Sequence, residues 1–285
     1  MALNLTVIDK EIGPFIHHYT WRDVILYALG VGAGFGDLPY VYEKNLKVIP
    51  TFSVATIMDF FFAVVKEANL NLSGILHGGQ ELIFHRPIPA SGTFTTVGRI
   101  THIYDKKEKG AVFVMQSDTH HDNGEELFTA RFSIFSRFDG NFGGGDIVME
   151  RPPFPDRPAD FVVKARPSDD QPLLYRLSGD YFELHVDPEF ARKSDFEKPI
   201  MHGLCTLGYA CRALIASFIP GTPEKVRRLK CRFTRPLYPG DPIETLTWKT
   251  ADGQALWRTL NTKTSETVID DGEFEYGMIP ASEKP

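Results

Sequence analysis

Residues 82–96 read LIFHRPIPASGTFTT, and residues 231–245 read CRFTRPLYPGDPIET. The pattern Phe-x-Arg-Pro in the first stretch recurs in the second at an offset of 149 residues, and the same offset places Pro50 on Pro199. An offset one residue shorter aligns ILYALGVG with LLYRLSGD. Because these landmarks keep their order and nearly constant spacing, we interpret the chain as two copies of one unit.

A segment rich in glycine and proline separates the two copies. Four glycines within 140–145 precede the stretch RPPFP, and both residue types interrupt helices and strands. We therefore predict a first repeat over residues 1–145, a linker over 146–168 and a second repeat over 169–285.

Each predicted repeat contains one long helix followed by several strands. Apolar residues recur with helical period over 53–68 and over 203–218, and shorter helical segments precede them near 20–30 and 170–178. Alternating β-branched and aromatic runs with turn signals follow each long helix, which predicts a meander of antiparallel strands. The pattern predicts an α+β fold, in which each sheet wraps around a buried helix. The two sheets can pair and leave a groove between the halves.

Composition and charge exclude several classes of protein. The chain is 42% hydrophobic and 24% charged, with a formal charge of −6, so it lacks the basic face typical of a nucleic-acid partner. No apolar run approaches the ~20 residues that span a bilayer. Three cysteines without a CxxC motif fit a reducing compartment. The start has no secretory signal pattern, and Ser282–Pro285 do not form a Ser-Lys-Leu-type address, so we expect a cytoplasmic rather than a peroxisomal protein.

The second copy carries an acid and an imidazole that the first copy lacks. Asp180 and His185 lie in YRLSGDYFELH, and an offset of 148 places them on Gly32 and Asp37. The copies share scaffold residues, whereas this pair is confined to one of them. A purely structural turn has less reason to differ between copies, so the difference favours a proton-transfer site over an ordinary turn.

The stretch YRLSGD, followed by LH and PIMHG, resembles the signature of the enoyl-CoA hydratase 2 family of MaoC-like proteins. The similarity extends to LYALGVGAG, VIPTF and ARFSIFSRFDGNFGGG, and so spans the chain. It implies a double hot-dog fold and the reversible hydration of trans-2-enoyl-CoA to (3R)-3-hydroxyacyl-CoA. It also implies a homodimer that uses a coenzyme A thioester as substrate, with no cofactor and no metal. The second repeat would carry the catalytic site, and the first would shelter the acyl chain.

The resemblance implies roles for individual residues. Asp180 and His185 would bind and activate a water molecule, because histidine can both accept and return a proton near neutral pH. Gly203 would present a backbone N–H to the thioester oxygen at a helix N-terminus, where no Cβ blocks the approach. The expected substrate contacts are His77, Gly78, Lys106, Tyr181, Phe182, Glu183, Leu184 and Phe233.

The chain departs from the family signature at Phe182-Glu183, where the family has Asn-Pro. An aromatic ring cannot replace the amide, so Phe182 would reshape the pocket, and Glu183 would restore part of the polar network. The alternative is a non-catalytic acyl-CoA-binding subunit of a hydratase complex. A hot-dog thioesterase is a further alternative, although the motif of the second repeat matches the hydratase pattern.

Other patterns have a structural interpretation. The histidines and aspartates of 118–122 precede Asn-Gly, which favours a hairpin turn over a metal site. The glycines of 30–36 lack the spacing of a nucleotide-binding loop. Phe233 repeats as Phe84, so packing explains it as well as ligand contact, and Arg235 is interpreted as fixing a strand edge.

Overall fold

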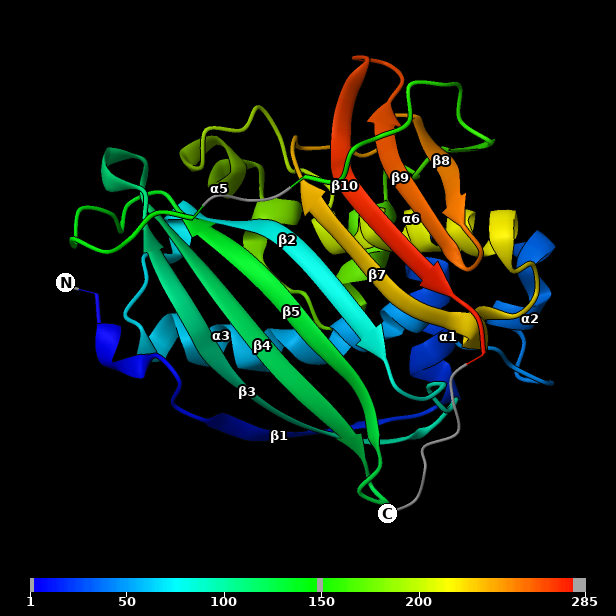
Figure 1. Cartoon of the computed structure of the whole chain (residues 1–285), viewed down its shortest axis with the longest axis horizontal. Coiled ribbons are helices and arrows are strands. Elements are labelled where there is room, and N and C mark those ends of the chain that lie inside the picture. Colours follow the sequence, from blue (N-terminus) through cyan, green and yellow to red (C-terminus); the bar gives the residue numbers. More distant parts are fainter. Residues whose placement is uncertain (1–2, 148–150, 279–285) are drawn as a thin grey trace.

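The computed structural model describes residues 3–147 and 151–278, and its ten strands form one continuous antiparallel sheet (Figure 1). The strands are β1 (Ile12–Tyr19), β2 (Ile75–Phe84), β3 (Gly92–Asp105), β4 (Ala111–His121), β5 (Glu126–Ser136), β6 (Phe161–Ala165), β7 (Val226–Phe233), β8 (Ile243–Ala251), β9 (Gln254–Asn261) and β10 (Glu266–Tyr276). The helices are α1 (Trp21–Gly30), α2 (Leu38–Val41), α3 (Ile57–Glu67), α4 (Gln171–Tyr175), α5 (Pro188–Lys193) and α6 (Gly203–Phe218). Three 3₁₀ turns matter for the site, η3 (Pro50–Thr56), η6 (Arg176–Ser178) and η7 (Glu183–His185). Ser282–Pro285, on which the prediction about targeting rests, lie outside the described residues.

The strand order repeats, as the duplication predicts. The sheet runs β1-β3-β4-β5-β2 and then β7-β10-β9-β8-β6, so each half has the same connectivity and the halves meet at β2 and β7. Gly79–Ile83 pair with Arg228–Arg232 across this seam. The predicted pairing of the two sheets is confirmed. The predicted meander holds for β3, β4 and β5 and for β8, β9 and β10. The first strand after each long helix departs from it, because β2 pairs with β5 and β7 pairs with β10, which leaves their other edges to pair with each other.

The edge strands β1 and β6 were not predicted. β6 lies inside segment 146–168, which is predicted to be a linker, and it pairs with β8. Its five residues, FVVKA, are too few to show the alternation of a strand, and the prolines around them indicate a loop.

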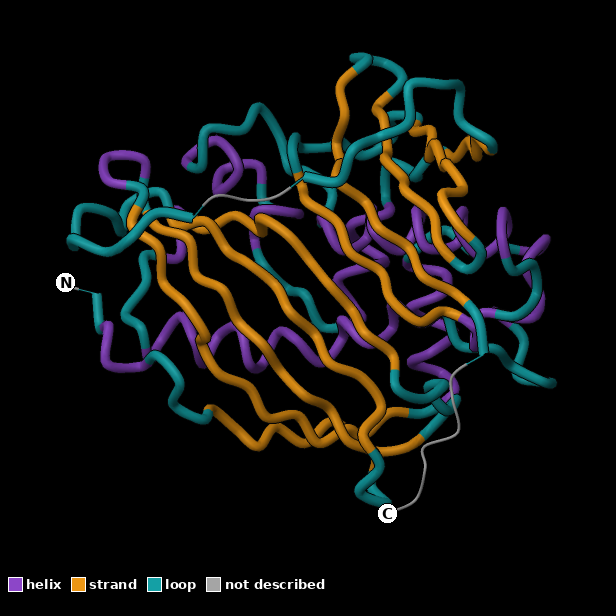
Figure 2. Tube along the Cα trace, viewed as in Figure 1, coloured by secondary structure: helices purple, strands orange, loops and turns teal. Residues whose placement is uncertain are grey.

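The two long helices lie behind the sheet in the view of Figures 1 and 2, and α6 is buried on nearly all sides. The prediction of a helix over 203–218 is confirmed. The prediction over 53–68 is wrong in its first turn, because 50–56 forms the 3₁₀ segment η3 and the α-helix begins at Ile57. Hydroxyl-bearing and β-branched residues dominate η3, and Thr56 Oγ1 donates to Ser53 O at 2.9 Å, so these side chains compete with helical hydrogen bonding.

Charged side chains cross the seam on the other face of the sheet. Arg228 lies 2.6 Å from Glu81, 2.9 Å from Glu273 and 3.0 Å from Glu275. Lys230 contacts Glu273 at 2.6 Å. Because one arginine contacts carboxylates on β2 and β10, this network stabilises the pairing of the two halves.

The three cysteines are free and buried, as expected of core thiols. The turn predicted at Asn123-Gly124 joins β4 to β5. Within 3–147 and 151–278, no helix is long and apolar enough to cross a membrane.

Candidate active site

A cavity of about 510 Å³ lies between the halves, where the sequence predicts a groove. The first half supplies side chains from α3, β2 and β5, and the second half supplies the segment around η7, the start of α6 and the end of β7. Apolar and aromatic side chains dominate the lining, with Asp180, His185 and His77 among the few polar groups. Such a composition is typical of a small-molecule site.

The loop after η6 brings Asp180 and His185 to the cavity wall. Gly179 has a φ of +122°, a conformation that favours glycine, and it turns the chain after η6. Asp180 Oδ1 then accepts a hydrogen bond from Phe182 N at 3.3 Å, which closes a short turn. Functional atoms of Asp180 and His185 lie within 4.8 Å of each other, so the predicted pair is brought together.

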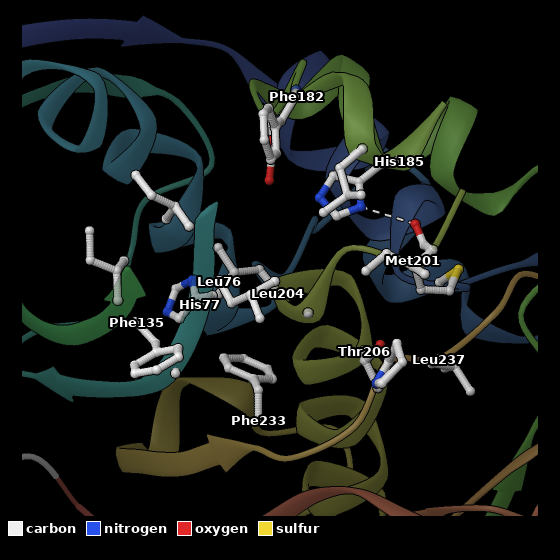
Figure 3. A pocket seen from close by; sticks show the side chains of 18 of the residues that line it. Leu76, His77, Phe135, Phe182, His185, Met201, Leu204, Thr206, Phe233 and Leu237 are labelled. Atoms are coloured by element: carbon white, nitrogen blue, oxygen red, sulfur yellow. Dashed lines mark hydrogen bonds between the residues drawn. The ribbon is translucent and has the colours of Figure 1, made fainter. Parts of the chain in front are cut away.

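The tautomer of His185 follows from its hydrogen bond. Nδ1 lies 3.0 Å from the carbonyl oxygen of Ile200, and a carbonyl can only accept, so Nδ1 carries the proton (Figure 3). In the neutral ring, Nε2 therefore keeps its lone pair. The arrangement provides a base whose orientation is set by the backbone.

Burial perturbs both titratable groups. It raises the pKa of Asp180, and the opposing charge of His185 reduces this effect. Burial lowers the pKa of His185, and the Asp180 carboxylate opposes that shift. Desolvation favours the neutral form of each group. His185 is therefore a neutral base at pH 7.

The N-terminus of α6 faces the same cavity. Gly203 is the first residue of α6, and His202, which precedes it, makes no side-chain cap. The N–H groups of the first turn have no acceptor within the helix and lie at the positive end of its dipole. A Cβ at Gly203 would lie 3.2 Å from Cδ1 and Cε1 of Phe233, so glycine leaves room beside the N–H.

His77 and Gly78 form the wall from the first half. The pairing of β2 with β5 shifts register between His77 and Gly79, and this bulge turns His77 toward the cavity. His77 Nε2 donates to Gly79 O at 3.1 Å, and the ring packs edge-on against Phe233 with centroids 5.0 Å apart. Burial lowers the pKa of His77 to about 4, so this ring is an uncharged contact surface near neutral pH.

Eight of the predicted site residues line the cavity, namely Asp180, His185, Gly203, His77, Gly78, Phe182, Leu184 and Phe233. Three predicted contacts do not. Tyr181 is 56% exposed and its ring lies under Arg176, while Glu183 is exposed on η7. Lys106 pairs with Asp146 and donates to Ile147 O at 3.1 Å, because the loop before the second half folds back onto the end of β3.

Phe182 does not separate the acid–base pair from the cavity. Its ring lines the wall and packs edge-on against Phe190, with centroids 5.3 Å apart, and against His185 at 6.1 Å. Together with Leu184, it belongs to an apolar cluster that holds the loop in place.

Several lining residues were missed from the sequence. Ile57, Met58 and Phe61 of α3 carry no motif, and only the long apolar helix pattern hinted at them. Arg235 lies at the cavity and 3.6 Å from Glu266, whereas the sequence suggested a role at a strand edge. His202, which does not line the cavity, is visible in PIMHG, but its contacts depend on the fold.

Among the described residues, Asp180, His185 and His202 also have ligand-type atoms within 4.8 Å of one another. The two imidazoles are stacked, with centroids 3.8 Å apart and an interplanar angle of 28°. Lone pairs in stacked rings point along nearly parallel planes, whereas zinc ligands converge tetrahedrally. The arrangement fits hydrogen bonding better than metal coordination.

Comparisons with known proteins agree with this geometry. The sequence models of the "MFE-2 hydratase 2 N-terminal domain" and the "MaoC like domain" match residues 17–138 and 151–271. The chain is 37% identical to 3-hydroxyacyl-thioester dehydratase Y of Mycobacterium tuberculosis, over 97% of this chain and 99% of the relative. It is also 37% identical to a probable enoyl-CoA hydratase 2 of Dictyostelium discoideum, over 93% and 94%. A solved MaoC-like dehydratase from Phytophthora capsici superposes with a TM-score of 0.86 at 30% identity, over 97% of this chain and 99% of that one.

The repeated connectivity and this structural match confirm the α+β double hot-dog fold. The chain belongs to the enoyl-CoA hydratase 2 family of MaoC-like dehydratases.

Proposed function

We propose that this protein hydrates trans-2-enoyl-CoA reversibly to (3R)-3-hydroxyacyl-CoA. The observation that carries the proposal is the placement of Asp180 and His185 at a mostly apolar cavity that also receives the N-terminus of α6. The relatives named as hydratases and dehydratases support the same class of reaction.

The acid–base pair activates the water. In the hydration direction, His185 Nε2 accepts a proton while the water oxygen bonds to C3 of the enoyl group, and the same proton can then be delivered to C2. Asp180 holds the second hydrogen of the water and balances the charge of the imidazolium. Water and substrate supply every atom of the product, so these steps require no cofactor.

The backbone N–H of Gly203 stabilises the oxygen of the thioester. Negative charge develops on this oxygen as C3 is attacked, and a donor fixed in advance at a helix N-terminus stabilises that charge more than it stabilises the ground state. The absence of a Cβ lets the thioester approach the N–H.

The acyl chain occupies the end of the cavity beneath α3. Ile57, Met58 and Phe61 offer an apolar surface there, whereas the cation of Arg235 marks a part of the wall better suited to the polar coenzyme. With this placement, the first repeat shelters the acyl chain. The side chains of α3 extend the cavity beyond the length that a short acyl group needs.

Met58→Trp should reduce kcat/KM for trans-2-decenoyl-CoA about tenfold more than for crotonyl-CoA, because the larger ring fills space that only the longer chain uses. Initial rates with both substrates measure the ratio. Phe62→Trp on the same helix is the matched control, since Phe62 is 41% exposed and does not line the cavity. An equal loss for both substrates would place the acyl chain elsewhere.

One assay separates the proposed reaction from the alternatives. The purified protein is mixed with crotonyl-CoA or trans-2-decenoyl-CoA, and the absorbance of the enoyl thioester is followed together with the release of free thiol. Hydration lowers the absorbance without releasing thiol. Thiol release would identify a thioesterase, and binding without a change in either signal would identify a non-catalytic subunit.

We expect a homodimer in the cytoplasm, as the family resemblance and the sequence suggest. Light scattering behind a size-exclusion column measures the mass in solution against the 32.1 kDa of one chain.

A further inference from the structure

His202 is a buried imidazole beside the acid–base pair, and the proposed reaction gives it no task. It is 1% exposed, it precedes Gly203, and its carbonyl oxygen accepts from Thr206 N at 3.1 Å and from Thr206 Oγ1 at 3.3 Å. It is thus fixed to the first turn of α6. A buried polar side chain at such a position needs compensating contacts.

The contacts of His202 lead to both members of the acid–base pair. Its Nε2 donates to the backbone carbonyl of Asp180 at 3.2 Å, which ties down the turn that carries the carboxylate. Its ring stacks on His185 with centroids 3.8 Å apart. Tyr175 packs against His202 at 4.8 Å and 52°.

The hydrogen bond to Asp180 also fixes the tautomer of His202. Since Nε2 donates, Nδ1 bears the lone pair in the neutral ring, and among the described residues this buried atom has no hydrogen-bond partner. Nδ1 therefore makes no contact that would hold the ring of His202 in place. The hydrogen bond from Nε2 to Asp180 O and the stacking on His185 account for the position of the ring.

We propose that His202 is a positioning residue, which holds the Asp180 turn and the plane of the His185 ring in register with the N-terminus of α6. This inference rests on the proposed function, because it assigns His202 a task in the same acid–base step. The hydrogen bond and the stacking contact have separate effects. The hydrogen bond fixes the turn that carries the Asp180 carboxylate, and the stacked ring excludes water from one face of His185.

The charged and titratable groups that face His202 are His185 on η7, Asp180 in the preceding turn, Arg176 on η6 and Tyr175 on α4. Burial and then the charge of His185 lower the pKa of His202 well below its usual value. A strongly lowered pKa makes His202 a poor proton acceptor, and its side chain does not line the cavity, so it is not a second base for the reaction.

Two substitutions separate the two effects. His202→Phe keeps a stacked ring but loses the donor, whereas His202→Gln keeps a donor but loses the ring. We expect kcat to fall about ten- to hundredfold in His202→Phe with KM within about threefold of the parent, because a misplaced carboxylate weakens the chemical step more than binding. In His202→Gln, water reaches the ring of His185, its pKa rises toward the ordinary value, and the acidic limb of kcat/KM moves to higher pH.

A readout independent of turnover accompanies the kinetics. Proton–nitrogen NMR spectra of isotope-labelled histidines follow the tautomer and the titration of His185, which His185→Asn identifies. We expect the Nδ1–H tautomer of His185 in the parent and a raised titration midpoint in His202→Gln only. His102→Leu is the matched control, because exposed His102 on β3 stacks on Tyr104 at 5.6 Å away from the cavity.

The outcomes distinguish a failure of the positioning role of His202 from a failure of the proposed hydratase function. Parental kcat and an unchanged His185 titration in both folded variants would overturn the role of His202. A parent protein that hydrates no enoyl-CoA would overturn the proposed function, and the NMR titration would still decide whether His202 sets the state of His185. Should either variant fail to fold, as judged by circular dichroism, the other still tests its own effect.

Discussion

His185→Ala should lower kcat for crotonyl-CoA and decenoyl-CoA more than a hundredfold, the size expected when a general base is lost. His185 Nε2 is the lone pair that the cavity offers to a water molecule, since Nδ1 is engaged with Ile200 O at 3.0 Å. KM should change little, because the imidazole is a small part of an apolar lining. Steady-state hydration rates measure the effect.

The protonation of His185 also predicts how kcat/KM changes with pH. His185 must be neutral to accept a proton, and burial lowers its pKa below 6.5. The parent enzyme should therefore keep its kcat/KM at pH 6.5 and lose it only as the pH falls further. The limb reports an apparent pKa of the Asp180–His185 pair, because the two groups interact.

The control for His185→Ala is His102→Ala, which removes an exposed imidazole from β3. This variant should keep the parental rate. If His185→Ala hydrates both substrates as fast as the parent, His185 is not the base and the proposed mechanism is wrong.

Gly203→Ala should lower kcat/KM about a hundredfold, comparable to the loss of one oxyanion donor. The new methyl group would lie 3.2 Å from two ring atoms of Phe233, in the space through which the thioester oxygen approaches the N–H. Alanine is favourable in a helix, so the free energy of unfolding should fall little. Hydration kinetics and thermal unfolding measure the two effects separately.

Gly36→Ala is the matched control for Gly203→Ala. A Cβ at Gly36 would meet nothing within 4 Å, and this glycine does not line the cavity. Full activity in Gly203→Ala would exclude the close approach of the thioester to the start of α6. A loss of activity with an equally large loss of stability would instead point to a packing role for Gly203.

The sequence predicts the second repeat better than the first for a physical reason. The run of residues that forms α6 is apolar all round and begins at glycine, so its bounds are visible in the pattern. The corresponding run of the first repeat follows Pro50 and carries threonine, serine and valine side chains that favour a 3₁₀ turn, so the α-helix starts later. β6 stayed hidden because its five residues become a strand only when β8 pairs with them.

The residues of the site also divide into those that a local pattern reveals and those that depend on distant contacts. The spacing of Asp180 and His185 lies within one loop, so sequence similarity could assign both. Lys106 was expected near the coenzyme, but its partner Asp146 comes from a loop 40 residues further along the chain. The stack of His202 on His185 depends on how a helix N-terminus meets a distant 3₁₀ turn. Contacts of this kind arise from tertiary packing, which no local pattern encodes.

The seam between β2 and β7 has an evolutionary consequence. Separation of the gene into two would leave a bare strand edge on each product, and such edges promote aggregation. At the positions that correspond to Asp180 and His185, the first copy has Gly32, which lies against Tyr209, and Asp37, which pairs with Arg212 at 2.6 Å. Both copies line one cavity and share one seam, so the loss of either copy would open the cavity and expose a strand edge at the same time.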